Sequence, residues 1–591
     1  MRGASLGVVG ALAAGLVIAP AGGATAAGSD DPVFYSVPAT SVAPVSDVAA
    51  RVSAGSSMAR ATGDTAAISK GLQALQVLKG ANGVGDQGLT VAAGPKHVVQ
   101  VGGNIVRTFT KNSGAVANTR QLGQLFGLSG VGVSQGTIVY DPVGKRFIAA
   151  AVTDDGGEVG LVLRVTQGTN PVQLTNWQPS VVFASNDSVN ADAVETDPMI
   201  GVSNDKIAIT TPIVDADEPA NKNRIFMFPK APIYSGNAPD PWAASVNSTY
   251  DGQAPAVNAS KENNIFIAVP DTDDVSLTTY TGAATTTEPS FSKSVTYPAS
   301  PLTVPPVVDQ GGGDDLDLGP LAFSGAAWRS GELFATAAGN CSGSACIRLI
   351  GLGTESGVTI IEDEKYKSTA GADWFSPSVA IDGAGYVHTA ATAVSDDSKG
   401  PSLAVLTLTK VSLADAAGSN LKARVIALGD EAFDDDGTPG TVDWYGSTGA
   451  AIDPTSPWDV WVTGPNGSAA VDNPNLASSV ARVSMAKNAA TIKASDTTVK
   501  KGTKVKFTLK LKRPDSGDSF KGMPITLQRK GGGKWKKIDN GTTSKKGVYK
   551  TTKTVKNTGR YRTLGKAVNQ VGGQGVAIEK VVSKQITITV K

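Results

Sequence analysis

The sequence predicts an all-β protein built in two parts, and three observations support this prediction. Apolar residues come in runs of four to eight, rich in Val, Ile, Thr and Phe and bounded by Gly, Pro, Asp or Asn, which is typical of short strands joined by turns. One phrase, consisting of a strand, a polar turn and a second strand, recurs along most of the chain. The charge is divided, because residues 488–591 hold 25 of the 53 Lys and Arg but only 5 of the 52 Asp and Glu. A part near −19 therefore precedes a part near +20, which bears on charged partners rather than on fold.

The first 27 residues predict a secretory signal peptide. Arg2 precedes an apolar run at 6–18, and small residues follow as far as Ala27, which is the layout of a cleaved export signal. A transmembrane helix would need about 20 apolar residues, and Pro20 interrupts this run. We therefore expect a chain without a membrane span that is secreted, extracellular or noncovalently associated with the cell wall.

Residues 28–85 are expected to form an N-terminal lead segment that is partly disordered. Residues 39–65 are rich in Ala, Ser and Val and poor in aromatics, which is typical of loosely ordered ends of domains. Within this segment, 68–78 is the one stretch with helical periodicity. We expect the repeated part of the chain to begin at residue 86.

The repeated phrase predicts a seven-bladed β-propeller over residues 86–487. Its seven copies lie at 89–101, 137–152, 198–211, 254–269, 321–337, 377–390 and 449–463. Successive turns are 47 to 71 residues apart, which leaves room for about four short strands, the content of one blade. A single four-stranded sheet cannot bury both of its faces, whereas sheets packed radially bury them against each other. An irregular array of β-sandwiches is the alternative.

Some copies of the phrase resemble secreted bacterial β-propellers with degenerate repeats, a group that includes sialidase-like and lectin-like folds. The resemblance lies in YDP at 140–142 with RF at 146–147, and in AIDG at 380–383, and it extends over about 89–485. It implies a fold and not an activity. The Asp boxes typical of sialidases, Ser-x-Asp-x-Gly-x-Thr-Trp, do not occur in the sequence, so the resemblance does not extend to sialidase chemistry.

Residues 488–591 predict an immunoglobulin-like (Ig-like) β-sandwich. Seven short alternating segments follow one another over about 100 residues, as in such sandwiches. The segment resembles the bacterial Ig-like domains appended to many secreted Gram-positive proteins, through ITLQR at 525–529, WKK at 535–537 and GVY at 547–549. This resemblance, too, implies a scaffold.

The excess of lysine in this C-terminal part predicts a polyanionic partner such as a cell-wall polymer. At 504–512 every second residue but one is Lys, so the charges fall on the solvent side of a strand. A single such lysine is an ordinary solvated residue, or it prevents another strand from pairing with the edge of the sheet. A net charge near +20, however, exceeds what solubility requires. Anionic glycans and the acidic part of the chain itself are alternatives. Nucleic acid is the least favoured, because few aromatics stand among the lysines.

Residues just before each copy of the phrase should meet at the rim of the propeller, since there the chain enters each inner strand. An acidic rim with aromatic side chains is typical of a mouth that binds a carbohydrate or peptide. The alternative is that each Asp caps a turn and each aromatic packs between blades. Two carboxylates about 5 to 9 Å apart could also act as the acid and base of a glycosidase. The candidate ligand-binding residues are Asp197, Asp251, Asp317, Asp373, Trp374, Asp443, Trp444 and Tyr445.

The cysteines and histidines limit the remaining chemistry. Cys341 and Cys346 are the only cysteines, and in an exported protein they predict a disulfide at a hairpin tip, worth about 2 kcal/mol for so short a loop. With only two histidines, His97 and His388, a multi-histidine metal centre is excluded. The acidic runs at 311–318 and 434–437 do not fit an EF-hand loop. We therefore predict no metal and no cofactor, with calcium held by these acidic loops as the alternative.

Three function classes remain open from the sequence. The first is an exported noncatalytic binding protein whose rim binds a glycan or peptide and whose Ig-like domain associates with a polyanionic surface. The second is an extracellular glycan-cleaving enzyme on the same propeller, which requires two converging carboxylates in an open cleft. The third is a structural or adhesive surface protein, which requires that packed side chains fill the mouth.

Overall fold

The structure is a computed structural model, and its described residues form an all-β protein. They are 33–36, 39–42, 72–82, 88–111, 113–128, 130–154, 159–184, 194–214, 222–239, 242–247, 254–258, 262–270, 274–281, 291–298, 303–310, 315–319, 322–354, 359–366, 372–383, 385–395, 398–408, 421–429, 432, 441–444, 447–456, 459–466, 477–485, 489–512, 524–531, 533–544, 546–565 and 581–591. The helices in these ranges are single turns: α1 (Leu122–Phe126), η1 (Leu174–Asn176) and α2 (Lys230–Tyr234). None of these described helices has the length and apolar character that crossing a membrane requires.

Each of the seven predicted phrases forms an antiparallel hairpin. Further strands extend each hairpin into an antiparallel sheet, and we number these ring sheets in chain order. The first contains β4 (Leu89–Ala93), β5 (His97–Gly102), β6 (Ile105–Thr110) and β7 (Val116–Gln121). The second contains β8 (Gly132–Asp141), β9 (Arg146–Asp154), β10 (Val159–Val165), β11 (Ser180–Ala184) and β2 (Ala39–Val42).

The third to fifth ring sheets follow the same order. The third contains β13 (Met199–Val202), β14 (Lys206–Val214), β15 (Lys222–Pro229), β16 (Trp242–Asn247) and β1 (Val33–Ser36), with β12 (Val194–Glu195) also pairing with β14. The fourth contains β17 (Ala254–Asn258), β18 (Ile265–Pro270), β19 (Asp274–Tyr280) and β20 (Phe291–Pro298). The fifth contains β22 (Phe323–Arg329), β23 (Glu332–Asn340), β24 (Ala345–Gly353) and β25 (Thr359–Tyr366). Short parallel pairings of β17 with β13 and with β22 link these three sheets at their innermost strands.

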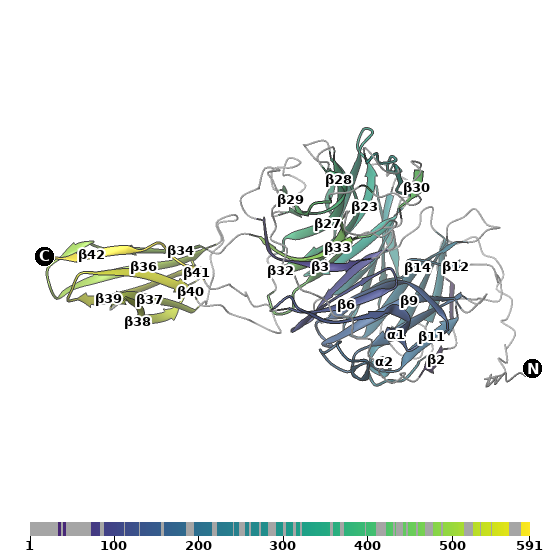
Figure 1. The fold of residues 1–591 in the computed structure, drawn as a ribbon, viewed down its shortest axis with the longest axis horizontal. Helices are drawn as coiled ribbons and strands as arrows, with labels where there is room; N and C mark the ends of the chain where they lie inside the picture. The colour runs from purple at the N-terminus through teal and green to yellow at the C-terminus, as the bar shows by residue number, and fades with distance from the viewer. Residues whose placement is uncertain are drawn as a thin grey trace, which may run out of the picture.

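The seventh ring sheet joins strands from two distant parts of the sequence. The sixth contains β26 (Asp373–Ile381), β27 (Val387–Ser395), β28 (Ser398–Leu408) and β29 (Leu421–Ala427). The seventh contains β31 (Gly449–Ile452), β32 (Asp459–Asn466), β33 (Ala477–Met485) and β3 (Leu72–Asn82). Figure 1 shows β3, at the purple end of the colour scale, beside the green strands of this sheet, in which β33 is its neighbour.

Packing between the sheets makes the architecture a β-propeller. The innermost strands contact one another in the order β4, β8, β13, β17, β22, β26 and β31, and β31 contacts β4 again. An apolar core fills the space between each sheet and the next, including the space between the seventh and the first. Because both faces of these sheets are covered, strands such as β9 and β27 are apolar on both sides, with buried alanines at 149–151 and 390–391.

The position of β3 corrects two expectations for the N-terminal segment. Its helical periodicity is not realised, because β3 pairs antiparallel with β33, from Leu72 opposite Met485 to Asn82 opposite Ala477. A short apolar run fits either structure by pattern, and here the open edge of β33 selects the strand. The ring therefore does not begin at residue 86. Strands β1 and β2 likewise add to β16 and β11, so the expected lead segment contributes to three ring sheets.

The C-terminal part is a sandwich of two sheets that lies apart from the ring (Figure 1). One sheet contains β34 (Ala489–Ala494), β36 (Thr503–Lys512) and β39 (Val548–Val555). The other contains β35 (Thr498–Val499), β37 (Pro524–Gly531), β38 (Lys534–Thr542), β40 (Gly559–Gly565), β41 (Val581–Val582) and β42 (Ile586–Val590). Buried residues of both sheets, among them Phe507, Leu509, Ile525 and Tyr561, form one core.

Candidate functional site

The rim, the side of the ring at which the innermost strands begin, is held together by polar side chains that reach from one sheet to the next. Between the seventh and first sheets, the Leu89 N–H donates to Ser447 Oγ at 3.0 Å. Between the first and second, the Ile138 N–H donates to Thr90 Oγ1 at 3.1 Å. Between the sixth and seventh, Thr448 Oγ1 donates to the Ser376 carbonyl at 2.7 Å. Because each bond satisfies backbone that no ladder pairs, the starts of these strands are fixed.

Three residues other than glycine in, or directly before, innermost strands at the rim have positive φ angles, which the sequence did not predict. Gln135, Asp197 and Ser376 have φ of 50°, 42° and 48°. Gln135 and Ser376 lie in bulges of β8 and β26, and Asp197 lies just before β13. Such conformations cost of order 1–3 kcal/mol each and re-aim side chains. Their sequence signal is shared: each stands directly before a Gly or a Pro.

Two predicted site residues meet through a short parallel strand pair. β21 (Asp315–Asp317) pairs with β30 (Thr441–Asp443), and the Cα atoms of Asp317 and Asp443 are partners in the register. The backbone N–H of Trp444 donates to the Asp317 carbonyl at 2.7 Å. The Asp317 carboxylate accepts a hydrogen bond from the Gly319 N–H at 2.9 Å. Residues far apart in sequence are thus adjacent, as the propeller prediction requires.

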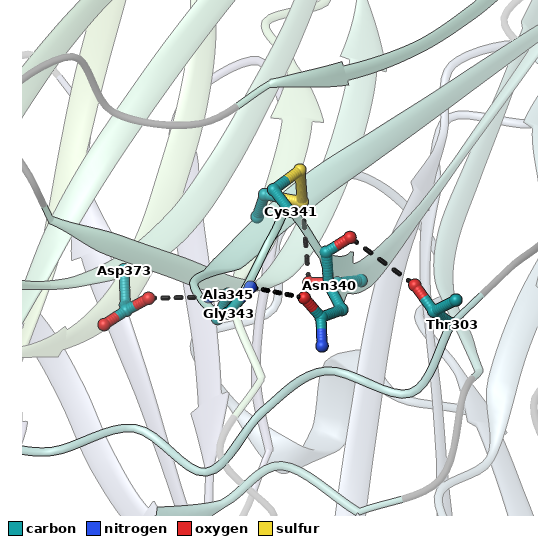
Figure 2. Close-up of a disulfide and its surroundings, with 8 residues drawn as sticks. Thr303, Asn340, Cys341, Gly343, Ala345 and Asp373 are labelled. Atoms are coloured by element: carbon teal, nitrogen blue, oxygen red, sulfur yellow. Dashed lines mark hydrogen bonds between the residues drawn. A yellow bond between two sulfur atoms is a disulfide. The ribbon is translucent and has the colours of Figure 1, made fainter.

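Asp373 is tied to the hairpin that carries the disulfide (Figure 2). Its Oδ1 accepts a hydrogen bond from the Ala345 N–H at 2.6 Å. At the hairpin tip, the Cys341 N–H donates to the Ser344 carbonyl at 2.9 Å. The predicted disulfide between Cys341 and Cys346 is confirmed, with a Cα–Cα distance of 5.8 Å. Asp373 therefore connects the start of β26 to the tip between β23 and β24.

The two tryptophans of the predicted rim are packed inside the protein. Trp374 is 7% exposed in the core between the fifth and sixth sheets. Trp444 is 4% exposed, meets Phe375 edge to face at 5.9 Å, and donates from Nε1 to Ser376 Oγ at 3.2 Å. Because both rings are buried, neither offers a free face to a sugar. Their large apolar surfaces stabilise the rim instead. The packing alternative describes these two positions.

Residues 303–310 and 315–319 contribute to an apolar group at the rim. Val308 and Leu316 form an antiparallel bridge, and both are buried. They belong to an apolar group, here called the rim cluster, which consists of Leu89, Val308, Leu316, Ala345, Phe375, Val394 and Trp444. The rim cluster therefore packs residues of the first, fifth and sixth sheets against Val308, Leu316 and Trp444.

Two of the remaining predicted site residues, Asp197 and Asp317, are described and are not part of the rim cluster. Asp197 is exposed, and its N–H donates to Gln135 Oε1 at 3.1 Å. Asp317 is half-buried. Asp251 and Tyr445 lie outside the described residues. The described part of the rim thus presents carboxylates rather than aromatic faces.

The acidic turn residues at the opposite ends of the inner strands are structural. Asp141, Asp382 and Asp453 are fully buried. Asp382 Oδ2 lies 3.2 Å from His388 Nε2, and His388 Nδ1 lies 2.9 Å from Thr407 Oγ1. The contacts link a carboxylate, an imidazole and a hydroxyl in the same order as in a nucleophilic triad. All three residues are 0% exposed, so no substrate reaches them, and His388 is a core histidine with a polar partner at each ring nitrogen.

Asp453 joins the seventh sheet to the first through a buried ion pair. Lys111 Nζ lies 2.7 Å from Asp453 Oδ1, and Trp461 Nε1 donates to Asp453 Oδ2 at 3.0 Å. Burial opposes the charged carboxylate, but the Lys111 ammonium and the donors around it lower the pKa of Asp453 below its ordinary value. This pair closes the ring on the side away from the rim.

Metal chemistry has no support within the described ranges, where no three His, Cys, Asp or Glu side chains gather in a way that could hold an ion.

The comparisons with known proteins leave the function open. No family model and no curated protein matches the chain. A mitotic checkpoint complex structure is similar over 73% of this chain and 98% of that one, with 10% identity and a TM-score of 0.37. An exo-β-1,3-galactanase from Phanerochaete chrysosporium is similar over 77% and 95%, with 10% identity and a TM-score of 0.28. An α-L-arabinofuranosidase from Lactobacillus brevis is similar over 61% and 96%, with 8% identity and a TM-score of 0.26. At these values the similarities carry no argument about activity.

Proposed function

We propose that this chain is an exported, noncatalytic binding protein. In this proposal the rim binds a glycan or peptide through its carboxylates, and the C-terminal sandwich associates with a polyanionic surface such as the cell wall. We further propose that the seven ring sheets are the blades of one propeller and that the sandwich is Ig-like. Export rests on the signal-like sequence of residues 1–27.

The observation that carries the proposal is the division of charge between two separate bodies. The ring holds most of the acids and the sandwich most of the lysines, and the two lie apart in Figure 1. A body near +20 attracts polyanions through its summed field, while the carboxylates of the rim accept hydrogen bonds from hydroxyl or amide groups of a ligand. One body would thus hold the protein in place while the other binds.

A second candidate, a glycan-cleaving enzyme, is favoured by the register of Asp317 and Asp443. This register places the backbones of the two Asp residues side by side, and a glycosidase needs two carboxylates about 5 to 9 Å apart. A third candidate, a structural or adhesive protein, is favoured by the rim cluster, because packed side chains fill part of the mouth. The binding proposal requires only that the carboxylates outside this cluster reach a ligand.

A glycan and peptide array probed with the purified full chain tests the proposal. We expect specific signals that fall at least about tenfold in a variant combining Asp197→Asn and Asp317→Asn, since hydrogen bonds to charged groups contribute about 1.5–3 kcal/mol each. Asp496→Asn, an exposed residue of the sandwich, is the matched control and should leave the signals unchanged. An array without specific signals, or signals that the rim variant retains, would contradict rim binding. Release of sugars from a bound glycan would establish the enzyme instead.

A further inference from the structure

The three-stranded sheet of the sandwich turns a regular set of lysines towards solvent. On β36, Val505, Phe507, Leu509 and Leu511 are 0% exposed and point into the core. The residues between them therefore point outwards, because side chains alternate along a strand. We call this outward surface the lysine face; its described members are Lys493, Lys504, Lys506, Lys510 and Lys550, with Thr491, Thr508, Thr552 and Thr554.

The strand register places threonine beside every lysine of this face. Lys504 is opposite Thr554 and Lys506 is opposite Thr552 on β39. Lys510 is opposite Thr491 on β34. Thr508 has Lys493 on one side and Lys550 on the other. No two of these lysines are directly opposite, an arrangement that avoids the destabilising pairing of like charges and sets a hydroxyl next to each ammonium group.

Edge protection does not explain these lysines. Lysines that block strand addition belong on edge strands, but β36 is the central strand of its sheet, between β34 and β39. Three lysines of the face lie on β36. Solvation alone would be served equally by a mixture of charges, whereas the described outward positions of β34, β36 and β39 include no Asp or Glu.

Asp539, an acid of the second sheet, is already used on the inner side of this sheet. Asp539 of β38 forms an ion pair with Lys553 Nζ at 3.1 Å and accepts a hydrogen bond from Tyr549 OH at 3.1 Å. Lys553 is opposite the buried Val505, so it points away from the lysine face. The positive charge of the face is therefore not balanced by this carboxylate.

The outer surface of the second sheet differs in kind. There the Arg562 guanidinium lies 4.2 Å from the centre of the Trp535 ring, and its Nε donates to Gln528 Oε1 at 2.8 Å. This arginine is held by its own neighbours, whereas the lysine face consists of flexible point charges. Lysine suits phosphate as a point charge, while arginine suits planar recognition of two oxygens at once.

We propose that the lysine face binds a linear phosphodiester polymer of the poly(glycerol phosphate) type, laid along β36. Lysines two residues apart on a strand are separated by about 7 Å, so an extended chain of phosphates meets successive ammonium groups without needing a groove. The threonine hydroxyls donate to the remaining phosphate oxygens. This inference rests on the proposed association of the sandwich with a polyanionic surface, and it names the surface and the ligand class.

The test compares two triple variants of the full chain that remove the same charge from different sheets. The first combines Lys504→Gln, Lys506→Gln and Lys510→Gln on the lysine face. The matched control combines Lys534→Gln, Lys536→Gln and Lys537→Gln, three exposed residues of β38. Binding to immobilised poly(glycerol phosphate) is measured over a range of salt concentrations, and thermal unfolding checks that both variants are folded.

We expect the affinity of the lysine-face variant to fall at least about tenfold, because each lysine near an anionic surface raises the affinity about fivefold. By analogy with nucleic acids, the slope of log affinity against log salt should fall by about two to three. The control variant should stay within about threefold of the natural chain. This pattern supports the inference.

The contrary outcomes are distinguishable. Equal losses in both variants would overturn the lysine face while leaving the polyanion association intact. A natural chain that binds no polyanion would overturn the association itself. Tighter binding to hyaluronate or to single-stranded DNA than to poly(glycerol phosphate) would overturn the ligand class. Salt-sensitive self-association that the lysine-face variant abolishes, without polymer binding, would identify the acidic ring of a second copy as the occupant.

Discussion

Replacing Lys111 by Met tests whether the ring closes between its first and seventh sheets. The substitution leaves the Asp453 carboxylate, 0% exposed and 2.7 Å from the ammonium group, without its cation. Breaking a buried pair by removing one partner costs about 3–5 kcal/mol. With an unfolding entropy of about 2.1 cal/mol/K per residue over roughly 400 ring residues, this loss lowers the melting temperature by about 4–6 °C.

Differential scanning calorimetry of the full chain measures this shift. Lys79→Met, on the exposed side of β3, is the control and should change stability by less than about 0.5 kcal/mol. Adding Asp453→Asn to Lys111→Met should restore part of the lost stability, because the neutral amide leaves no buried charge. A melting temperature within about 1 °C of the natural chain, or no recovery in the double variant, would refute the assigned closure.

Three further predictions concern the rim and the buried acid. Trp444→Ala should lower the free energy of unfolding by about 3–5 kcal/mol, because it leaves a cavity at a buried position. Val304→Ala, at a side chain that is 55% exposed, is the control and should change stability little. Equal melting temperatures of the two variants would contradict the rim cluster. Replacing both Cys341 and Cys346 by Ser should cost about 2 kcal/mol and open the hairpin tip to proteases, and unchanged proteolysis would contradict this. The pKa of Asp453 is lowered in the folded state, so its carboxylate contributes stability above about pH 4 that is lost as pH falls through the lowered pKa. Asp453→Asn should therefore reduce the fall in the free energy of unfolding at acidic pH. An unchanged pH dependence would contradict this prediction.

The repeated phrase was sufficient to locate the inner hairpins of the ring. Each copy has two apolar strands and a polar turn of its own, so its pairing is local and its signal lies within about 15 residues. The disulfide could also be predicted from the sequence, because its two cysteines are the only ones in the chain. The alternation of Lys with apolar residues at 504–512 likewise anticipated which side of β36 is buried.

The candidate site was only partly predictable for a physical reason. Asp317 and Asp443 were placed on one rim from the repeat alone, and the β21–β30 pairing brings them together. The sequence could not show that Trp374 and Trp444 pack inwards, since an aromatic residue before a strand fits a binding mouth and a core equally well. Val308 and Leu316, which pack in one cluster with Trp444, have no local sequence signal for this contact.

The sequence by itself determined the all-β class, the positions of the hairpins, the disulfide and the division of charge, because strand periodicity and composition are local properties. Only the tertiary structure decided that β3 completes the seventh sheet, that Lys111 pairs with Asp453, and that the rim tryptophans fill a core. The first two of these contacts join residues more than 300 positions apart. Such contacts form only when sheets close around a common axis and bury the faces that single sheets leave exposed.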